Sequence, residues 1–245
     1  MDDTLKGAII SAAQEAGFFL RRQASSRKTA YDMEKRARDL MVRTIRAADP
    51  SVSLWGEAQE GARAVSICPL DSPVNFSRGF GEFGVMAAII EEGSPVFAVI
   101  SLPERGSMVT AERGRGARAD GRKLSASRRD DIRASLVCCY CDMYSDGEYA
   151  PGIEAIGALS RNGIAWRNTG SPAADYAAVA AGAIDGVVVP LHEASHAAGF
   201  LVMQEAGAVV TDLEGKPFSV FSAGVVAAGP NLHQGILEVV TSPFR

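Results

Sequence analysis

Apolar side chains recur every three or four residues through most of the first fifty positions, which is the spacing of one helix face. The first such stretch covers residues 5–22, and the second runs from about residue 32 to 48 and stops before Pro50. A short polar loop, residues 25–28, separates them. The pattern therefore predicts two amphipathic helices, each of which packs one face on a core.

From residue 51 the pattern changes to short runs rich in Val, Ile and Phe, which glycines separate. These runs predict strands in an antiparallel meander, at residues 52–55, 64–68, 84–90, 96–101 and 108–111. After a charged junction at residues 127–131, strands and helices alternate. Strands are predicted at 135–139, 164–167, 186–189 and 208–211, with helices at 153–160, 173–181 and 195–206.

This change of pattern predicts a mixed α+β and α/β fold with two subdomains in one compact unit. Residues 1–128 form the α+β subdomain with two helices and an antiparallel sheet, and residues 129–245 form the α/β subdomain. Each half exposes a sheet face that the other has to cover, so we expect a shared interface.

Composition narrows the class of protein. The chain has 245 residues, 47% of them hydrophobic and 22% charged, which is typical of a globular protein and excludes a disordered or low-complexity chain. A net charge of −4 argues against direct nucleic-acid binding, because the chain has no surplus of cations for phosphates. No apolar run reaches the ~18 residues of a membrane span, so we expect no membrane partner and a cytoplasmic location.

Three local motifs have simpler structural explanations. The glycines of residues 114–119 favour a tight turn over a nucleotide-binding loop, since no helical pattern follows them. The cysteines of residues 138–141 lack a second ligand pair for zinc, which favours small buried thiols. His192 and His196 are four residues apart, but a turn at Pro190 favours structural roles for both.

Several motifs together resemble the inositol monophosphatase family. Gly56-Glu57-Ala58 and residues 68–79, CPLDSPVNFSRG, are similar to the family's GEE and DP(I/L)DGTxNFxxG motifs. The resemblance continues in order through AERGRGA at 111–117, GSPAA at 170–174, VAAGAIDG at 179–186, ASHAAG at 194–199 and EAG at 205–207. It covers nearly the whole chain and implies a layered α/β/α/β/α sandwich that pairs as a homodimer.

The same resemblance points to an altered metal site. The family hydrolyses phosphate monoesters with Mg²⁺ held by four carboxylates and one backbone carbonyl. The matching carboxylate positions are Ala58, Cys68, Asp71 and Ser195, and Leu70 offers the carbonyl. A methyl, a thiol and a hydroxyl are poor ligands for a hard cation, and Glu57 with Asp71 cannot balance two Mg²⁺ ions. We therefore expect no cofactor and no bound metal.

The phosphate and substrate contacts also differ from the family pattern. Ser72-Pro73 replaces the family's Gly-Thr, and proline has no N–H for a phosphate. The threonine that helps to activate water is thereby lost, while its acidic partner matches Glu34. The candidate phosphate and substrate pocket comprises Ser72, Pro73, Gly170, Ser171 and, at the position of a substrate-binding glutamate, Val188.

Three functions stay open on this basis. The first is a pseudoenzyme with a binding or regulatory role, through a small molecule in the old pocket or through a protein partner such as the transcription machinery. The second is a repurposed, metal-independent enzyme with Cys68 as nucleophile or acid/base and Asp71, Ser195, His196 or Glu57 beside it. The third is a phosphomonoesterase with an atypical Mg²⁺ site at Glu57 and Asp71.

The contact between Cys68 and His196 separates the first two functions. If Ser195 faces the pocket from a helix start, His196 lies about 100° around the axis. The side chain of His196 then need not face Cys68, so we expect no hydrogen bond between them.

Overall fold

A computed structural model of the chain describes residues 3–24, 29–57, 62–140, 150–191 and 193–242. Two β-sheets and seven α-helices make up this part of the chain. Ala58 and Cys141 fall outside the described residues, as does His192.

The N-terminal sheet is the predicted antiparallel meander, with its strands in chain order. The strands are β1 (Ala64–Cys68), β2 (Val85–Glu91), β3 (Ser94–Leu102), β4 (Ser107–Glu112), β5 (Gly116–Ala119) and β6 (Arg122–Lys123). The strand predicted at 52–55 is wrong: Leu54 makes only an isolated parallel bridge to Val65, at the outer edge of β1. That segment is too short and too irregular to extend the sheet.

The second sheet has the order β10-β11-β9-β7-β8. Its strands are β7 (Leu136–Cys139), β8 (Ala165–Arg167), β9 (Gly186–Val189), β10 (Val209–Asp212) and β11 (Val225–Ala228). β7 runs parallel to β8 and β9, whereas β11 runs antiparallel to β9 and β10. The apolar pattern does not predict β11, which is a run of four small apolar residues without a helix directly before it.

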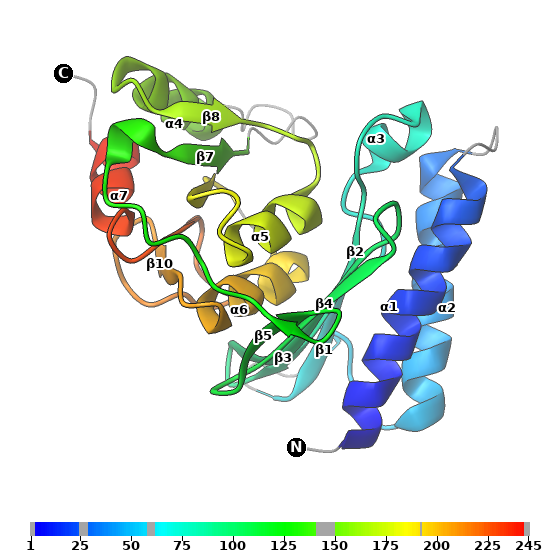
Figure 1. Cartoon of the computed structure of the whole chain (residues 1–245). Coiled ribbons are helices and arrows are strands. Elements are labelled where there is room, and N and C mark those ends of the chain that lie inside the picture. Colours follow the sequence, from blue (N-terminus) through cyan, green and yellow to red (C-terminus); the bar gives the residue numbers. More distant parts are fainter. Residues whose placement is uncertain (1–2, 25–28, 58–61, 141–149, 192, 243–245) are drawn as a thin grey trace.

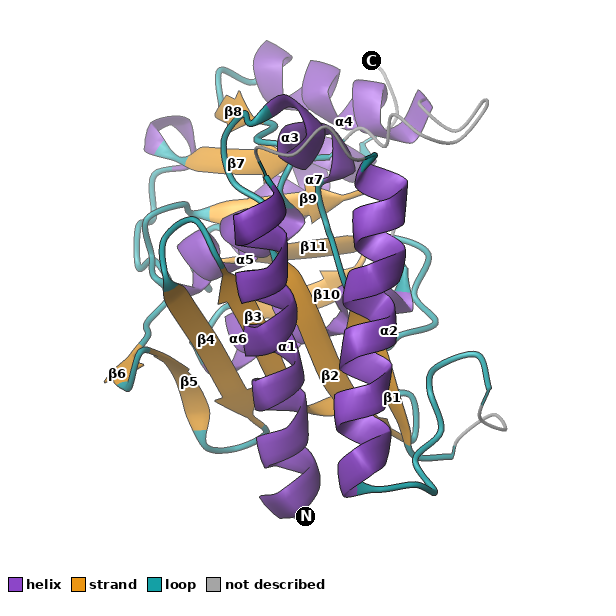
Figure 2. Cartoon of the chain, turned by 90° about the vertical axis from the view of Figure 1, so that its right-hand side faces the viewer, coloured by secondary structure: helices purple, strands orange, loops and turns teal. Residues whose placement is uncertain are grey.

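The helices form three layers around the sheets (Figure 1). They are α1 (Asp3–Gln23), α2 (Ala30–Ala48), α3 (Pro73–Arg78), α4 (Ala150–Arg161), α5 (Pro172–Ala180), α6 (Ala197–Glu205) and α7 (His233–Thr241), and short 3-10 turns cover Ile132–Ala134 and Ala194–His196. Figure 2 shows α1 and α2 side by side over one face of the first sheet. α5 and α6 lie between the sheets, and α4 and α7 cover the outer face of the second. The predicted α/β/α/β/α layering is confirmed.

Alternation along β2 shows how one strand serves two layers. Met86 and Ala88 join the core around α5 and α6, whereas Ala87 and Ile89 join the core under α1 and α2. Because both faces are buried, the strand reads as a continuous apolar run.

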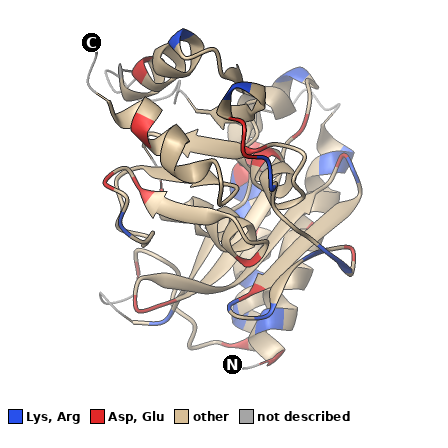
Figure 3. Ribbon diagram, turned by 60° about the vertical axis from the view of Figure 1, so that its left-hand side comes forward, with Lys and Arg blue, Asp and Glu red and all other residues tan. Residues whose placement is uncertain are grey.

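On the face of the molecule shown in Figure 3, charged residues lie mostly on helices and loops. No helix in the described ranges is long and apolar enough to cross a membrane.

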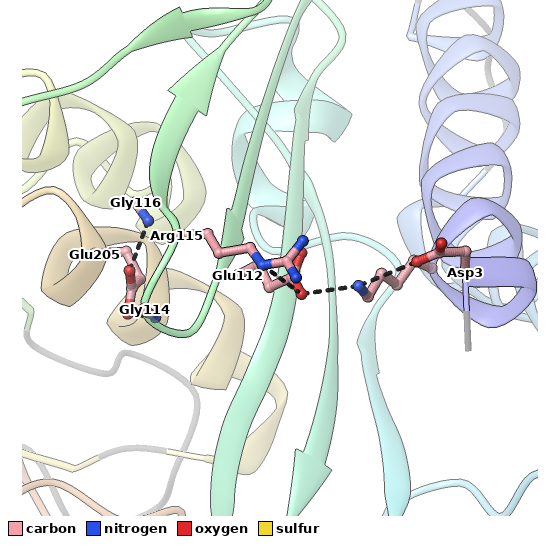
Figure 4. A network of polar contacts seen from close by, with 7 residues as sticks. Asp3, Glu112, Gly114, Arg115, Gly116 and Glu205 are labelled. Carbon is pink, nitrogen blue, oxygen red and sulfur yellow. Dashed lines mark hydrogen bonds and ion pairs between the residues drawn. The ribbon is translucent and has the colours of Figure 1, made fainter. Parts of the chain in front are cut away.

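A carboxylate from α6 holds the turn between β4 and β5. Glu205 accepts hydrogen bonds from the backbone N–H groups of Gly114 and Gly116, each at 2.8 Å (Figure 4). The two glycines have φ angles of 74° and 82°, which other residues rarely adopt. The interpretation of this glycine motif as a tight turn is confirmed. Nearby, Lys6 and Arg115 both pair with Glu112.

The chain crosses between the sheets at residues 124–135. Asp185 accepts hydrogen bonds there from the Ser127 hydroxyl at 2.5 Å and from the Leu136 N–H at 2.9 Å. This carboxylate ties the crossing segment to the entry of β9. The subdomain boundary at residue 128 stays a prediction.

Candidate functional site

Asp71, the carboxylate retained from the family's metal motif, follows β1 and faces the N-terminus of α5. Its Oδ1 accepts a hydrogen bond from the Gly84 N–H at 2.6 Å. Its Oδ2 accepts bonds from the Ser171 hydroxyl and the Ala173 N–H, both at 2.8 Å. Burial raises the pKa of this carboxyl to about 7, against the opposing effect of its hydrogen bonds. Asp71 therefore joins β1, the start of β2 and α5.

The phosphate-pocket candidates next to Asp71 are brought together, but they bond to one another. The Ser72 hydroxyl donates to the carbonyl of Gly170, and Pro73 opens the six-residue helix α3 without an N–H of its own. The Asn75 amide reaches the same loop, since its Nδ2 donates to the carbonyl of Thr169 at 3.0 Å. These contacts fasten α3 to the loop before α5.

Val188 does not belong to this pocket, and its assignment as a pocket residue is wrong. It is fully buried in β9 and packs with Val137 and Val226 in the core between the second sheet and the helices α4 and α7. The neighbouring Val187 and Val189 face the α5 and α6 layer instead. Strand alternation therefore turns position 188 away from the site.

Cys68 lies at the end of β1 with 7% of its surface exposed. Burial raises the pKa of its thiol well above the usual value, and the nearby carboxylates of Asp71 and Glu34 raise it further. The sulfur accepts a hydrogen bond from the Leu70 N–H. In the part of the chain that the structure describes, Cys68 has no hydrogen bond to His196. A buried neutral thiol is a weak nucleophile.

His196 instead meets Tyr176, a residue that sequence analysis missed. The Tyr176 hydroxyl lies 3.0 Å from Nδ1 of His196, and their ring centroids are 5.9 Å apart. Tyr176 is fully buried and packs against Gly199, where an added Cβ would fall 1.9 Å from Cδ2 of the tyrosine ring. The one sequence signal for this packing is the glycine of the ASHAAG segment.

A second buried carboxylate, Asp175, directly precedes Tyr176 in α5. Asp175 accepts hydrogen bonds from the Tyr140 hydroxyl and, at 2.9 Å, from the Thr169 hydroxyl. Burial raises the pKa of Asp175, and the Cys138 thiol also donates to it. Cys138 is thus a buried thiol, as expected. The described residues contain no group of three or more His, Cys, Asp or Glu side chains that could hold a metal ion.

The Glu57 carboxylate contacts α2. Its Oε2 accepts hydrogen bonds from Nη2 of Arg46 at 2.7 Å and from the Leu54 N–H at 3.2 Å. The bond from Leu54, and then the Arg46 guanidinium, lower the pKa of the Glu57 carboxyl. Glu57 and Asp71 therefore have different sets of partners.

Two further candidates lie near Cys68 without joining one network. Ser195, in the turn before α6, donates a hydrogen bond to Oε2 of Glu193 at 3.2 Å. Glu34 extends from α2, and burial raises the pKa of its carboxyl while the charge of Arg38 opposes the shift. These groups and Cys68 come from three separate elements.

Comparisons with known proteins bear on the family and the fold of the chain. The sequence model of the inositol monophosphatase family matches residues 3–242. The chain is 30% identical over 222 residues to the Nus factor SuhB of Escherichia coli K12, a match that covers 88% of this chain and 83% of the relative. The Nus factor SuhB of Salmonella typhimurium LT2 is also 30% identical, over 223 residues.

Solved structures show the same architecture. The extragenic suppressor protein SuhB of Bartonella henselae superposes with a TM-score of 0.85 at 25% identity, covering 99% of this chain and 100% of that one. An inositol monophosphatase from Anabaena has a TM-score of 0.84 at 22% identity, over 96% of this chain and 94% of that one, and supports the fold alone. The chain belongs to the inositol monophosphatase family.

Proposed function

We propose that this family member does not hydrolyse phosphate monoesters with Mg²⁺ and acts through binding instead. The observation that carries the proposal is the bonding of Asp71. Its two oxygens accept three hydrogen bonds from Gly84, Ser171 and Ala173, so they serve as structural acceptors between two strands and a helix.

The other groups at the family's metal positions do not fit Mg²⁺. This cation prefers hard oxygen ligands and several negative charges. Cys68 offers a buried thiol with a raised pKa, and Ser195 offers a neutral hydroxyl. Glu57, the carboxylate closest in sequence to the missing ligand Ala58, is paired with Arg46. We therefore derive no catalytic step through a metal.

The two enzyme alternatives receive less support. A Cys68-dependent enzyme needs an ionised thiol, but burial and the nearby carboxylates of Asp71 and Glu34 raise the pKa of this thiol well above its usual value. An atypical metal phosphatase needs Glu57 and Asp71 to converge, but one bonds to α2 and the other to α5. A binding role requires neither arrangement.

The named relatives favour a protein partner. Relatives at 30% identity carry the name Nus factor, so we propose the transcription machinery as the class of partner, with a cytoplasmic homodimer as the binding form. Sedimentation of the purified chain tests the dimer. Co-sedimentation with transcription complexes assembled from purified components tests the partner, and no association at micromolar concentration would contradict it.

A phosphatase assay tests the central proposal. The purified chain is incubated with inositol phosphates and sugar phosphates, with Mg²⁺ and with Mn²⁺, beside an active family member as positive control. We expect no phosphate release above background, because each lost electrostatic element typically costs ~10²–10³ in rate. Metal-dependent release that Asp71→Asn abolishes would overturn the proposal.

A further inference from the structure

A small cavity lies at the outer edge of β1, between α2 and the turn before α6. Its volume is about 70 Å³, and its polar lining comes from Arg38, Ser66 and Ser195, with Leu54 and Trp55 beside them. Since a water molecule takes about 30 Å³ of liquid, the cavity has room for about two waters or one small polar group.

Ser66 supplies the strongest sign that something binds there. Its side chain is 2% exposed, and its hydroxyl has no hydrogen-bond partner among the described residues. Leaving a buried hydroxyl without a partner is costly, and such groups in folded proteins are satisfied by water or by a ligand. Ser66 lines the cavity, so a group bound there can supply the missing partner.

The other polar groups of the cavity can also donate hydrogen bonds. The guanidinium of Arg38, in α2, acts electrostatically on the carboxylates of Glu34 and Glu57, but it has no direct hydrogen bond or ion pair with any residue in the described ranges. The Ser195 hydroxyl donates to Glu193, an exposed side chain that can be exchanged for another acceptor. Within the described part of the chain, no carboxylate lines the cavity. The lining therefore favours an acceptor-rich, negatively charged group.

The surface beside the cavity strengthens this preference. Arg38 and Leu54 also line a groove of about 690 Å³ along α2. Three more arginines, Arg36, Arg43 and Arg46, line that groove, whereas its described acidic residues are Asp39 and Glu57. The groove thus carries a positive charge on a chain whose net charge is −4. Anions are drawn toward the cavity entrance.

We propose that this cavity binds a small oxyanion without a metal ion. Arg38 supplies charge-assisted hydrogen bonds, and the hydroxyls of Ser66 and Ser195 supply the others. Both a tetrahedral oxyanion, such as phosphate, and a planar carboxylate group can accept hydrogen bonds from these donors. The inference deepens the proposed binding role and rests on it, but it concerns affinity and not turnover.

The test titrates the full chain with phosphate, sulfate and acetate in EDTA at constant ionic strength. Calorimetry and the shift of the melting temperature report binding. We expect saturable binding of at least one of these anions, weakened about tenfold or more in Arg38→Gln, because a charge-assisted bond is lost. Arg43→Gln is the matched control, since Arg43 lies on the same helix and lines the groove but not the cavity.

Ser66→Ala separates binding from folding. It removes an unpartnered buried hydroxyl, so the free protein should be as stable as the wild type or more so, while anion affinity falls several-fold. Saturable binding of acetate alone would support the site and identify carboxylates as its ligands. Saturable binding of phosphate or sulfate would identify tetrahedral anions as its ligands.

Three results would overturn the inference: no saturable binding, affinity equal in wild type and Arg38→Gln, or a crystal structure in phosphate with only ordered water beside Ser66. Phosphatase activity in the separate assay would overturn the proposed function, but the result of the anion titration would still decide whether the cavity binds an oxyanion.

Discussion

The hydroxyl of Tyr176 lies 3.0 Å from Nδ1 of His196, which joins α5 to the turn before α6. Ser195, the residue before His196, matches the position of the aspartate in the family's WD motif. Burial raises the pKa of the Tyr176 phenol well above its usual value, and the charges of Asp175, Asp71 and Cys68 raise it further. A buried, neutral phenol therefore lies among the positions that match metal ligands.

Packing around this phenol gives the first prediction. Gly199→Ala should destabilise the chain by roughly 1–3 kcal/mol or more, because the new methyl would overlap the Tyr176 ring. Gly7→Ala is the matched control in α1: nothing lies within 4 Å of its added Cβ, so it should be neutral or stabilising by up to about 1 kcal/mol. Urea unfolding measures both. Equal stability of the two variants would show that the Tyr176 ring moves away easily.

Asp71 should make stability depend on pH. Its pKa is about 7 in the folded chain and near the ordinary value of 3.8 in the unfolded chain. Between these values the folded state holds a proton that the unfolded state lacks. The free energy of unfolding should therefore decrease as pH rises from about 4 to 7, by at most about 1.4 kcal/mol per pH unit from this group, and level off above.

The pH prediction is tested by urea unfolding across that window. Asp71→Asn should remove this part of the slope, whereas Asp39→Asn, on the exposed face of α2, should keep it. A slope that is unchanged in Asp71→Asn would assign the effect to other groups.

Cys68 should be unreactive in the folded chain. Iodoacetamide followed by mass spectrometry should label it much more slowly than after unfolding in urea, because the thiol is buried and its pKa is raised. Cys68→Ala should cost about 1 kcal/mol of stability and leave any binding function intact. Rapid labelling at neutral pH in the folded chain would favour the repurposed enzyme.

Magnesium should not bind at the family position. Calorimetric titration of the wild type should show no saturable Mg²⁺ binding below about millimolar, and EDTA should leave the melting temperature unchanged. The double variant Cys68→Asp/Ser195→Asp restores two carboxylates, so its affinity for Mg²⁺ should rise. Submillimolar binding by the wild type would support an atypical metal site.

The spacing of apolar residues predicted most of the helices and strands, but it did not predict toward which layer individual side chains point. The helices α1 and α2 and the meander follow from apolar spacing, since each packs a face on one core. Position 188 lies in a strand buried on both faces, so its pattern carries no sign of which face it joins. The direction of Glu57 depends on Arg46, a partner that no motif connects to it. Tyr176 was missed because its role depends on a glycine 23 positions later in the chain.

The position of α6 between the sheets has a consequence for how the protein is made. Met86, Ala88 and Ile100 of the first sheet share a core with Phe200 and Leu201 of α6, and Glu205 of the same helix holds the β4–β5 turn. A ribosome completes those strands long before it adds α6. Until then the nascent chain carries a sheet with one uncovered apolar face, the kind of surface that chaperones recognise and that drives aggregation. The N-terminal sheet therefore needs protection from aggregation until about five sixths of the chain has emerged from the ribosome and α6 can cover it.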